Sequence, residues 1–201
     1  RTPLGPDVGE GWGSMSTTHV VSRTVRDSAL MLDMTHGPAA GDPYHAPYFD
    51  GSYLEAIKQA PKQLRVGLNM SPGSGVGWAD SEGVAAITST LSLLEALGHR
   101  VEVMTLGLDE ALFSAATHIL VCANAANSLQ SRARALGHAS LSLDFIETNT
   151  MHCAKLGATF SAEDYARAVA AIHAAGRQVE EQFQQCDLIL SPTLLQPTVP
   201  L

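Results

Sequence analysis

Hydrophobic and polar residues recur along this chain with two different periods, and these periods predict both helices and strands. Spacings of three and four residues, the period of one helix face, are clearest in residues 161–183. Their single apolar stripe consists of Tyr165, Val169, Ile172, Gly176, Val179 and Phe183. Short apolar runs at 64–69 and 186–193 and an alternating run at 99–106 predict strands. Helices and strands mixed in this way predict an α/β fold.

Capping residues indicate where several helices begin. Thr24 with Asp27, and Ser161 with Asp164, have the form of capping boxes, in which each side chain satisfies a free backbone amide of the other residue. Asp80 has the same role in front of an apolar stripe formed by Val84, Ile87, Leu91 and Leu94. The predicted helices are 24–37, 53–59, 80–98, 109–137 and 161–183. Strand 64–69, helix 80–98 and strand 99–106 predict a right-handed crossover onto a helix-covered sheet, while 138–160 shows no clear pattern.

Composition narrows the classes of partner. The chain has 201 residues, enough for one domain with a buried core, and carries 20 acidic against 12 basic residues. Its net charge of −8 repels phosphate backbones, so we expect no nucleic-acid partner. We also expect no membrane association, because we identify neither an apolar stretch of spanning length nor a signal-peptide pattern. Cys122, Cys153 and Cys186 lack C-x-x-C spacing, which favours free thiols and a cytoplasmic location.

Several kinds of catalytic or cofactor site are not predicted. Gly73, Gly75 and Gly77 form G-x-G-x-G, which fits neither a dinucleotide fingerprint nor a P-loop, so a plain loop is favoured. The sequence contains no G-x-S-x-G nucleophile elbow. His152 and Cys153 are adjacent and therefore point in different directions, and no second pair lies at ligand spacing. We expect neither a metal nor a cofactor.

Cys122 and Asn124 are the candidate substrate-binding residues. They lie in the apolar segment LVCANAANS, whose small side chains would allow a ligand or another chain segment to approach closely. The alternative, which the residue types alone favour, is a buried free thiol that packs as a small hydrophobic group. Both interpretations are open at this stage.

The chain contains SRTVRDSALMLDMTHGP (22–38), GDPYHAP (41–47) and CDLILSPTLLQP (186–197) in this order. These segments, together with three others between them, resemble segments of the amidase-signature hydrolases. The D-P-Y loop in particular is similar to that of one branch of general amidases. Glu147 and Thr150 stand where that branch often has an E-P-x-T pattern. The matching segments are SRTVRDSALMLDMTHGP (22–38), GDPYHAP (41–47), LRVGLN (64–69), LEALGHRVEVM (94–104), SAEDYARAV (161–169) and CDLILSPTLLQP (186–197).

The resemblance implies that the catalytic residues lie outside this chain. The family uses a lysine, a bridging serine and a nucleophilic serine in a D-T-G-G-S type turn, and all three motifs precede the point that matches Arg1. Lys58, Lys62 and Lys155 do not stand in the matching context, so no catalytic residue is assigned here. The implied fold is a portion of the amidase-signature fold, a large mixed β-sheet surrounded by helices. We expect residues 1–201 to be a partial domain of a longer protein.

The implied activity of the complete protein is hydrolysis of a small-molecule amide, from carboxamide to carboxylic acid plus ammonia or an amine. The isolated chain is expected to be inactive, and a homodimer is left open. One alternative is an amidotransferase subunit that acts on aminoacyl-tRNA, although the D-P-Y features argue against it. The other is a non-catalytic scaffold or binding domain.

Overall fold

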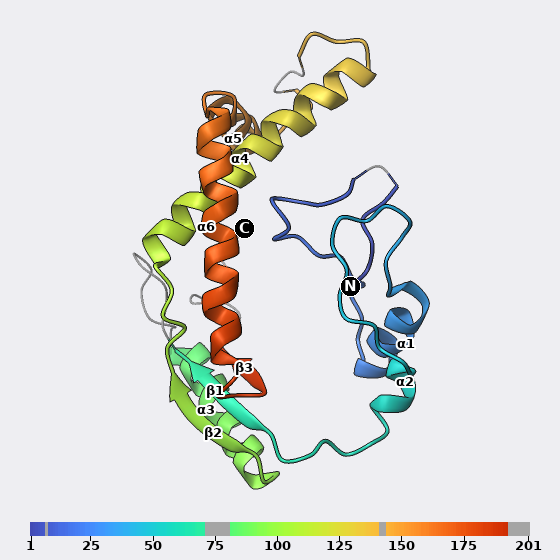
Figure 1. The fold of residues 1–201 in the computed structure, drawn as a ribbon, viewed down its shortest axis with the longest axis vertical. Coiled ribbons are helices and arrows are strands. Elements are labelled where there is room, and N and C mark those ends of the chain that lie inside the picture. The colour runs from blue at the N-terminus through green and yellow to red at the C-terminus, as the bar shows by residue number, and fades with distance from the viewer. Residues whose placement is uncertain (7, 71–80, 141–143, 193–201) are drawn as a thin grey trace. The chain divides into compact units, whose positions relative to one another are not determined.

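The computed structural model describes residues 1–6, 8–70, 81–140 and 144–192, and Figure 1 shows the arrangement of the chain. The chain forms two compact units, each built from two stretches of sequence. The first unit contains Arg1–Ala60 and Thr117–Val169, and the second contains Pro61–Ala116 and Ala170–Leu201.

A small parallel sheet lies in the second unit. Its strands are β1 (Arg65–Asn69), β2 (Arg100–Met104) and β3 (Leu188–Leu190), in the spatial order β2-β1-β3. Both neighbours run parallel to the central β1. The three predicted strands are therefore confirmed, and so is the α/β class. Within the described residues the sheet is small and wholly parallel, so the large mixed sheet expected of the whole fold is not contained in it.

The core of the second unit follows the central strand. Val66 pairs with Val101 on one side and with Leu188 on the other. Val66 and Leu68 are only 1% and 5% exposed, whereas Val103 on the edge strand β2 is 80% exposed. Apolar side chains on parallel strands are normally covered on both faces. The described part of the chain thus covers the middle of this sheet and leaves its edge strands open.

An ion pair joins Arg65, the first residue of β1, to Asp187, which directly precedes β3. Asp187 accepts hydrogen bonds from the backbone amide of Arg65 at 2.7 Å and from its Nη2 at 2.8 Å. The Asp187 amide donates in return to the Arg65 carbonyl at 2.8 Å. These bonds from Arg65 hold the pKa of Asp187 below its ordinary value. Two strands that are far apart in the sequence are joined in this way.

Helix α3 (Ser81–Ala96) connects β1 to β2, as the sequence predicts. The predicted loop 71–80 and the cap Asp80 lie outside the described residues. Of the predicted apolar stripe, only Ile87 is buried, and Val84 is 41% exposed. The five-residue strands β1 and β2 are each about 17 Å long, whereas the 16-residue helix is about 24 Å long, so the sheet covers only part of the stripe.

The first unit is helical and begins with an irregular segment. Its helices are α1 (Val25–Thr35), α2 (Tyr53–Ala56), α5 (Thr148–Gly157) and most of α4 (Glu110–Ala135). The Oγ1 of Thr24 accepts from the Asp27 amide at 3.0 Å, which confirms the predicted cap of α1. Helix α2 is shorter than the predicted 53–59, and α5 lies in the region where no element was predicted.

Helix α4 matches the predicted helix 109–137, and Gly137 beyond its end has a φ of +73°, a conformation that favours glycine. Among the described residues, α4 is the one helix long and apolar enough to cross a membrane by length and composition alone. The expectation that no apolar stretch has spanning length is therefore wrong for α4. Because core helices of soluble proteins pass the same criterion, the expectation of no membrane association stays a prediction.

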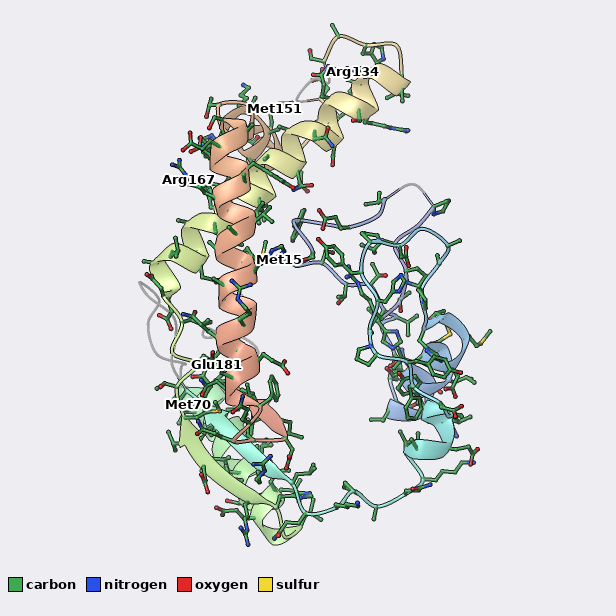
Figure 2. All side chains as sticks on the ribbon, viewed as in Figure 1. Met15, Met70, Arg134, Met151, Arg167 and Glu181 are labelled. Atoms are coloured by element: carbon green, nitrogen blue, oxygen red, sulfur yellow. The ribbon has the colours of Figure 1, made fainter. Side chains whose placement is uncertain are left out.

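Helix α6 (Ala162–Gln182) begins with a complete capping box. Asp164 Oδ2 accepts from the Ser161 amide at 2.9 Å, and Ser161 Oγ accepts from the Asp164 amide at 3.1 Å. Arg167, labelled in Figure 2, adds an ion pair with Asp164 at 2.6 Å. The hydrogen bonds from Ser161, followed by that from Arg167, lower the pKa of Asp164 to about 2. The predicted start of this helix is confirmed in detail.

The buried face of α6 differs from the predicted stripe. Ala168 and Ala175 are the buried residues, at 2% and 7% exposure, whereas Phe183 is 39% exposed and Gly176 is exposed. Spacing along a helix indicates which residues share a face. It does not indicate which other segment, if any, covers that face.

Candidate functional site

The first candidate substrate-binding residue, Cys122, is fully buried in α4 at 0% exposure. Helix α5 packs against it so closely that a Cβ at Gly157 would overlap the Cys122 carbonyl and lie 2.8 Å from the Ala123 amide nitrogen. Its Sγ lies 3.8 Å from Nε2 of His118, one turn earlier in α4. Burial raises the pKa of the Cys122 thiol, and the Cys153 thiol of α5 raises it further. Because the Cys122 thiol is out of reach of solvent and its raised pKa keeps it protonated, it is not placed to attack a substrate that arrives from solvent.

The second candidate, Asn124, is half-buried, and its Nδ2 donates to the Leu120 carbonyl at 2.9 Å. Two residues apart on a helix corresponds to a rotation of about 200°, so the side chains of Cys122 and Asn124 leave α4 in nearly opposite directions. The structure therefore does not bring the two candidates together in one pocket of the described chain. Their proximity to a substrate stays a prediction.

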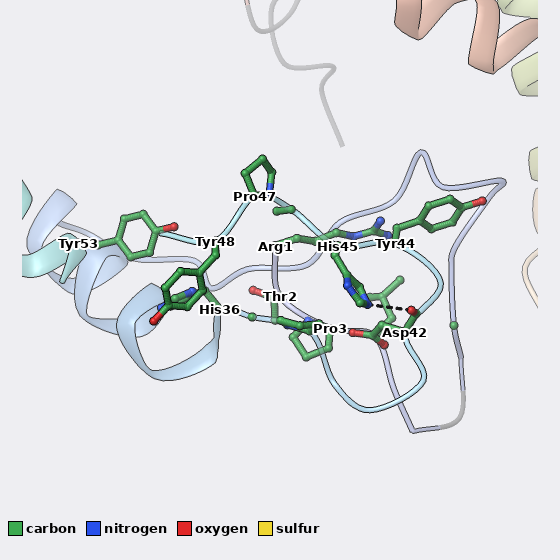
Figure 3. Close-up of a pocket in the computed structure, with 15 residues that line it drawn as sticks. Arg1, Thr2, Pro3, His36, Asp42, Tyr44, His45, Pro47, Tyr48 and Tyr53 are labelled. Atoms are coloured by element: carbon green, nitrogen blue, oxygen red, sulfur yellow. Dashed lines mark hydrogen bonds between the residues drawn. The ribbon is translucent and has the colours of Figure 1, made fainter. Parts of the chain in front are cut away.

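One cavity of the first unit has a volume of about 190 Å³ and lies between the N-terminal segment and the loop that follows α1 (Figure 3). The ends of α1 and α2 complete its wall. Aromatic rings, prolines and a few polar groups line it. The lining includes Arg1, Thr2, Pro3, His36, Asp42, Tyr44, His45, Pro47, Tyr48 and Tyr53.

Polar contacts fix the loop that forms one side of this cavity. Asp42 Oδ2 accepts from the Ala39 amide at 2.7 Å, and the Asp42 carbonyl lies 3.1 Å from Nε2 of His45. The Arg1 guanidinium lies 5.6 Å from the centre of the Tyr44 ring, within the range of a cation–π contact. A hydrogen bond to the Glu10 carboxylate raises the pKa of Tyr44. The D-P-Y loop is thus a folded wall of the cavity.

Asp33 holds the opposite wall by joining α1 to α2. Its carboxylate accepts from Ser52 Oγ at 2.6 Å, from the Tyr53 amide at 2.6 Å and from the Leu54 amide at 3.0 Å. The bond from the Ser52 hydroxyl is the main cause that lowers the pKa of Asp33. Tyr53 is thereby placed edge-on to His36, with ring centres 5.1 Å apart. A side chain of α1 therefore positions an aromatic ring of the cavity wall.

The cavity has the character of a binding surface rather than of a catalytic centre. Thr2 Oγ1, a polar atom of the lining, is buried and has no hydrogen-bond partner in the described part of the chain. Within those residues no group of three or more His, Cys, Asp or Glu side chains could hold a metal ion. The groups present can orient a small polar molecule or another segment. They do not pair a nucleophile with a base.

Sequence reasoning did not identify this cavity. The only signal was the D-P-Y loop, which marked a resemblance and was not connected with a cavity. No sequence pattern marked Arg1, Thr2 or His36. These residues converge through contacts between segments more than 30 residues apart, such as the 3.1 Å hydrogen bond from the Gly37 amide to the Arg1 carbonyl. The cavity is a product of tertiary structure.

Known proteins with similar sequences and folds include enzymes that act on amides. An acylamidase of Rhodococcus erythropolis is 41% identical over 81 residues, which cover 40% of this chain and 17% of that protein. The 6-aminohexanoate-cyclic-dimer hydrolase of Paenarthrobacter ureafaciens is 34% identical over 103 residues, 50% of this chain and 21% of that protein. A solved structure of 6-aminohexanoate cyclic dimer hydrolase superimposes with a TM-score of 0.72 and 26% identity, covering 82% of this chain and 34% of the other.

This chain therefore spans about a third or less of the length of these relatives. The amidase family itself matches residues 8–201, nearly the whole chain. The match agrees with the segment order from the D-P-Y loop to the last strand and with the superposition on an amide hydrolase. The chain belongs to the amidase family, and the resemblance to amidase-signature enzymes is confirmed.

Proposed function

We propose that the complete protein hydrolyses a carbon–nitrogen amide bond of a small molecule, giving a carboxylic acid and ammonia or an amine. The observation that carries the proposal is the match of residues 8–201 to the amidase family. The names of the relatives, an acylamidase and a cyclic-dimer hydrolase, support the same reaction class. One solved relative is complexed with its substrate, which supports a small-molecule ligand.

The mechanism proposed is that of a Ser–Ser–Lys acyl-enzyme. A neutral lysine takes a proton from the nucleophilic serine through the bridging serine, and the serine oxygen bonds to the amide carbon. Backbone amides stabilise the oxyanion while the C–N bond breaks and the protonated amine leaves. Water then cleaves the ester and releases the acid. The lysine can act as a base at neutral pH only if desolvation lowers its pKa.

In this proposal the chain supplies scaffold and part of the substrate pocket. Two features of the sheet support a scaffold role that other segments complete. Val103 on β2 is 80% exposed, and Leu188 on β3 is 36% exposed, although both belong to parallel strands. Such residues are usually covered by helices or neighbouring strands. The proposed completing segments carry the lysine and both serines, upstream of Arg1.

The primary test measures amide hydrolysis by the complete protein. Purified protein is assayed with simple aryl amides, and the proposed nucleophilic serine of the upstream turn is changed to alanine. We expect kcat to fall by about 10³-fold or more, because no other group can form the acyl-enzyme. Ser92→Ala is the matched control, since Ser92 is an exposed residue of α3 whose hydroxyl donates to the Thr88 carbonyl of the same helix. Full activity of the nucleophile variant would contradict the mechanism.

The coding region provides an independent test. Sequencing upstream of the codon for Arg1 is expected to reveal an open reading frame that encodes the lysine and serine motifs. A start codon within a few residues of Arg1 would contradict the proposal that these motifs belong to the same protein.

The substrate-pocket role of Cys122 and Asn124 is tested through specificity. Asn124→Leu removes one amide bond within α4 and adds apolar bulk, so it is expected to change the ratio of kcat/KM for small and bulky amides. Cys122→Ser is preferable to Cys122→Leu, because the Cys122 side chain is fully buried and the larger leucine would overpack its surroundings. If neither variant changes the ratio while both fold normally, the two residues serve only the core.

The same assays distinguish the alternative functions. A tRNA amidotransferase subunit would hydrolyse no simple amide and would need a partner subunit and charged tRNA for turnover. A scaffold or binding domain would bind a defined ligand without product formation. Hydrolysis of an aryl amide by the purified protein alone contradicts both alternatives.

A further inference from the structure

Two cysteines lie near the contact between helices α4 and α5. Cys122 belongs to α4 and Cys153 to α5, and the structure records both as free. Burial, and after it the neighbouring Cys153 thiol, raise the pKa of the Cys122 thiol. Neither the proposed hydrolysis nor the cavity of the first unit involves Cys153. The pair therefore requires an explanation of its own.

The backbones of the two helices are unusually close at this point. A Cβ on Gly157 would overlap the Cys122 carbonyl, so the contact is formed by glycine and backbone. Packed helices usually lie 8–10 Å apart, with side chains filling the space between them. Cys153 precedes Gly157 by one helical turn and so lies on the same side of α5. A disulfide needs Cα atoms about 4.4–6.8 Å apart, and close helix contacts of this kind favour such distances.

The two thiols differ in their access to solvent. Cys122 is 0% exposed, whereas Cys153 is partly exposed. A small oxidant can therefore reach Cys153 first, while Cys122 is protected until a partner forms next to it.

We infer that Cys153 and Cys122 form a peroxide-dependent disulfide that joins α5 to α4. The Cys153 thiolate attacks a hydroperoxide, the O–O bond breaks, and Cys153 becomes a sulfenic acid while the oxidant leaves as an alcohol or water. The Cys122 sulfur then attacks the sulfenic sulfur, the S–O bond breaks, and water leaves. In sum, two thiols and one hydroperoxide give one disulfide, one water and one alcohol, or two waters when hydrogen peroxide reacts.

A base for the second step lies next to Cys122. Its Sγ is 3.8 Å from Nε2 of His118, which is itself an exposed residue. The imidazole can take the thiol proton as the S–S bond forms and pass it to solvent. Disulfides in reducing compartments are usually of this transient, oxidant-dependent kind. The cross-link goes beyond the proposed hydrolysis and does not depend on it.

The test maps each thiol separately in the complete protein. Each of the three cysteines falls on its own tryptic peptide, with Cys122 in 101–132, Cys153 in 135–155 and Cys186 in the peptide that starts at residue 178. The folded protein is exposed to hydrogen peroxide, alkylated, reduced and alkylated again with a heavier reagent. We expect Cys122 and Cys153 to lose their first label in equal amounts, and peptides 101–132 and 135–155 to appear linked. Dithiothreitol should restore both thiols.

Variants at each cysteine give the controls. Cys122→Ser should abolish the linked peptide and drive Cys153 to the sulfinic acid, whereas Cys186→Ser should leave the cross-link unchanged. The inference is overturned if Cys153 in the unchanged protein goes to sulfinic acid, stays reduced, or links to Cys186. The unchanged protein alone decides between these outcomes if a variant fails to fold.

Discussion

Gly157 is the residue whose substitution tests the packing of the first unit most directly. It is the last residue of helix α5, where replacing glycine with alanine gains at most the roughly 1 kcal/mol of a helix interior. Here a Cβ would overlap the Cys122 carbonyl and come within 2.8 Å of the Ala123 amide nitrogen. Both obstacles are backbone atoms of α4, which cannot rotate away. The helices would have to separate, and Cys122 and Ala154, now 0% and 8% exposed, would lose contacts.

The expected cost follows from these opposing effects. Overpacking a well-packed contact costs about 1–3 kcal/mol, and the backbone overlap favours the upper part of that range. After allowance for the gain in helix propensity, Gly157→Ala should lower the free energy of unfolding by about 1–2 kcal/mol. The measurement is urea unfolding of the complete protein, monitored by circular dichroism. The free energies of unfolding of variant and parent are compared provided that both have the same m-value.

Two other glycines provide matched controls for the same substitution. Gly176 lies in α6 with nothing within 4 Å of an added Cβ, so Gly176→Ala should stabilise by about 0.5–1 kcal/mol. Gly67 in β1 would bring a Cβ against the flexible end of Met104 and within 3.3 Å of Cys186 Sγ. Because the Met104 side chain can move, Gly67→Ala should fall between the other two. If Gly157→Ala stabilises as much as Gly176→Ala, the inferred close contact of α4 and α5 is wrong.

Three further predictions concern the helix caps and the isolated chain. Asp33→Asn should destabilise α2. The pKa of Asp33 is lowered in the folded protein, so its contribution to stability is present above its ordinary pKa and is lost as the pH falls through the lower value. The variant should therefore lose less stability below pH 4 than the parent. The pKa of Asp164 is about 2 instead of its ordinary 3.8, so Asp164 should stabilise α6 fully above about pH 4 and lose that effect between pH 4 and 2. Titration of the carboxyl group followed by NMR checks the pKa. Asp164→Asn should abolish the pH dependence. Residues 1–201 expressed alone should show no hydrolysis of aryl amides. They should also aggregate, because exposed apolar side chains such as Val103 are not covered. A soluble monomer with a sharp thermal transition would contradict the prediction of aggregation.

Features that depend on neighbours in the sequence were predicted well. The capping boxes at Thr24 and Ser161 form as expected, because a cap needs only a side chain and an amide three residues away. The three strands also lie where apolar runs predicted them. A short apolar run between turn residues indicates a strand by itself, but it does not indicate which strands pair with it.

Features that depend on distant partners were not predicted. Phe183 and Val84 belong to apolar stripes but are exposed, whereas the alanines 168 and 175 are buried. Burial is decided by what covers a face, and a periodic pattern does not contain that information. Helix α5 was missed for a related reason: its N-cap, Glu147, makes no side-chain capping bond. The cavity wall of the first unit likewise depends on Asp33 reaching Ser52 across 19 residues.

The close contact of α4 with α5 connects packing with thiol chemistry, and this connection gives a final prediction. The glycine at 157 lets the backbones approach, and the same approach brings Cys153 to Cys122. Gly157→Ala, at a urea concentration where it remains folded, should therefore lower the yield of the peroxide-dependent cross-link, because separated helices hold the two sulfur atoms outside bonding distance. Gly176→Ala should leave the yield unchanged, since it lies in open space on another helix. If Gly157→Ala destabilises the protein while the cross-link forms in full, helix separation does not control the thiol pair, and the two observations have separate causes.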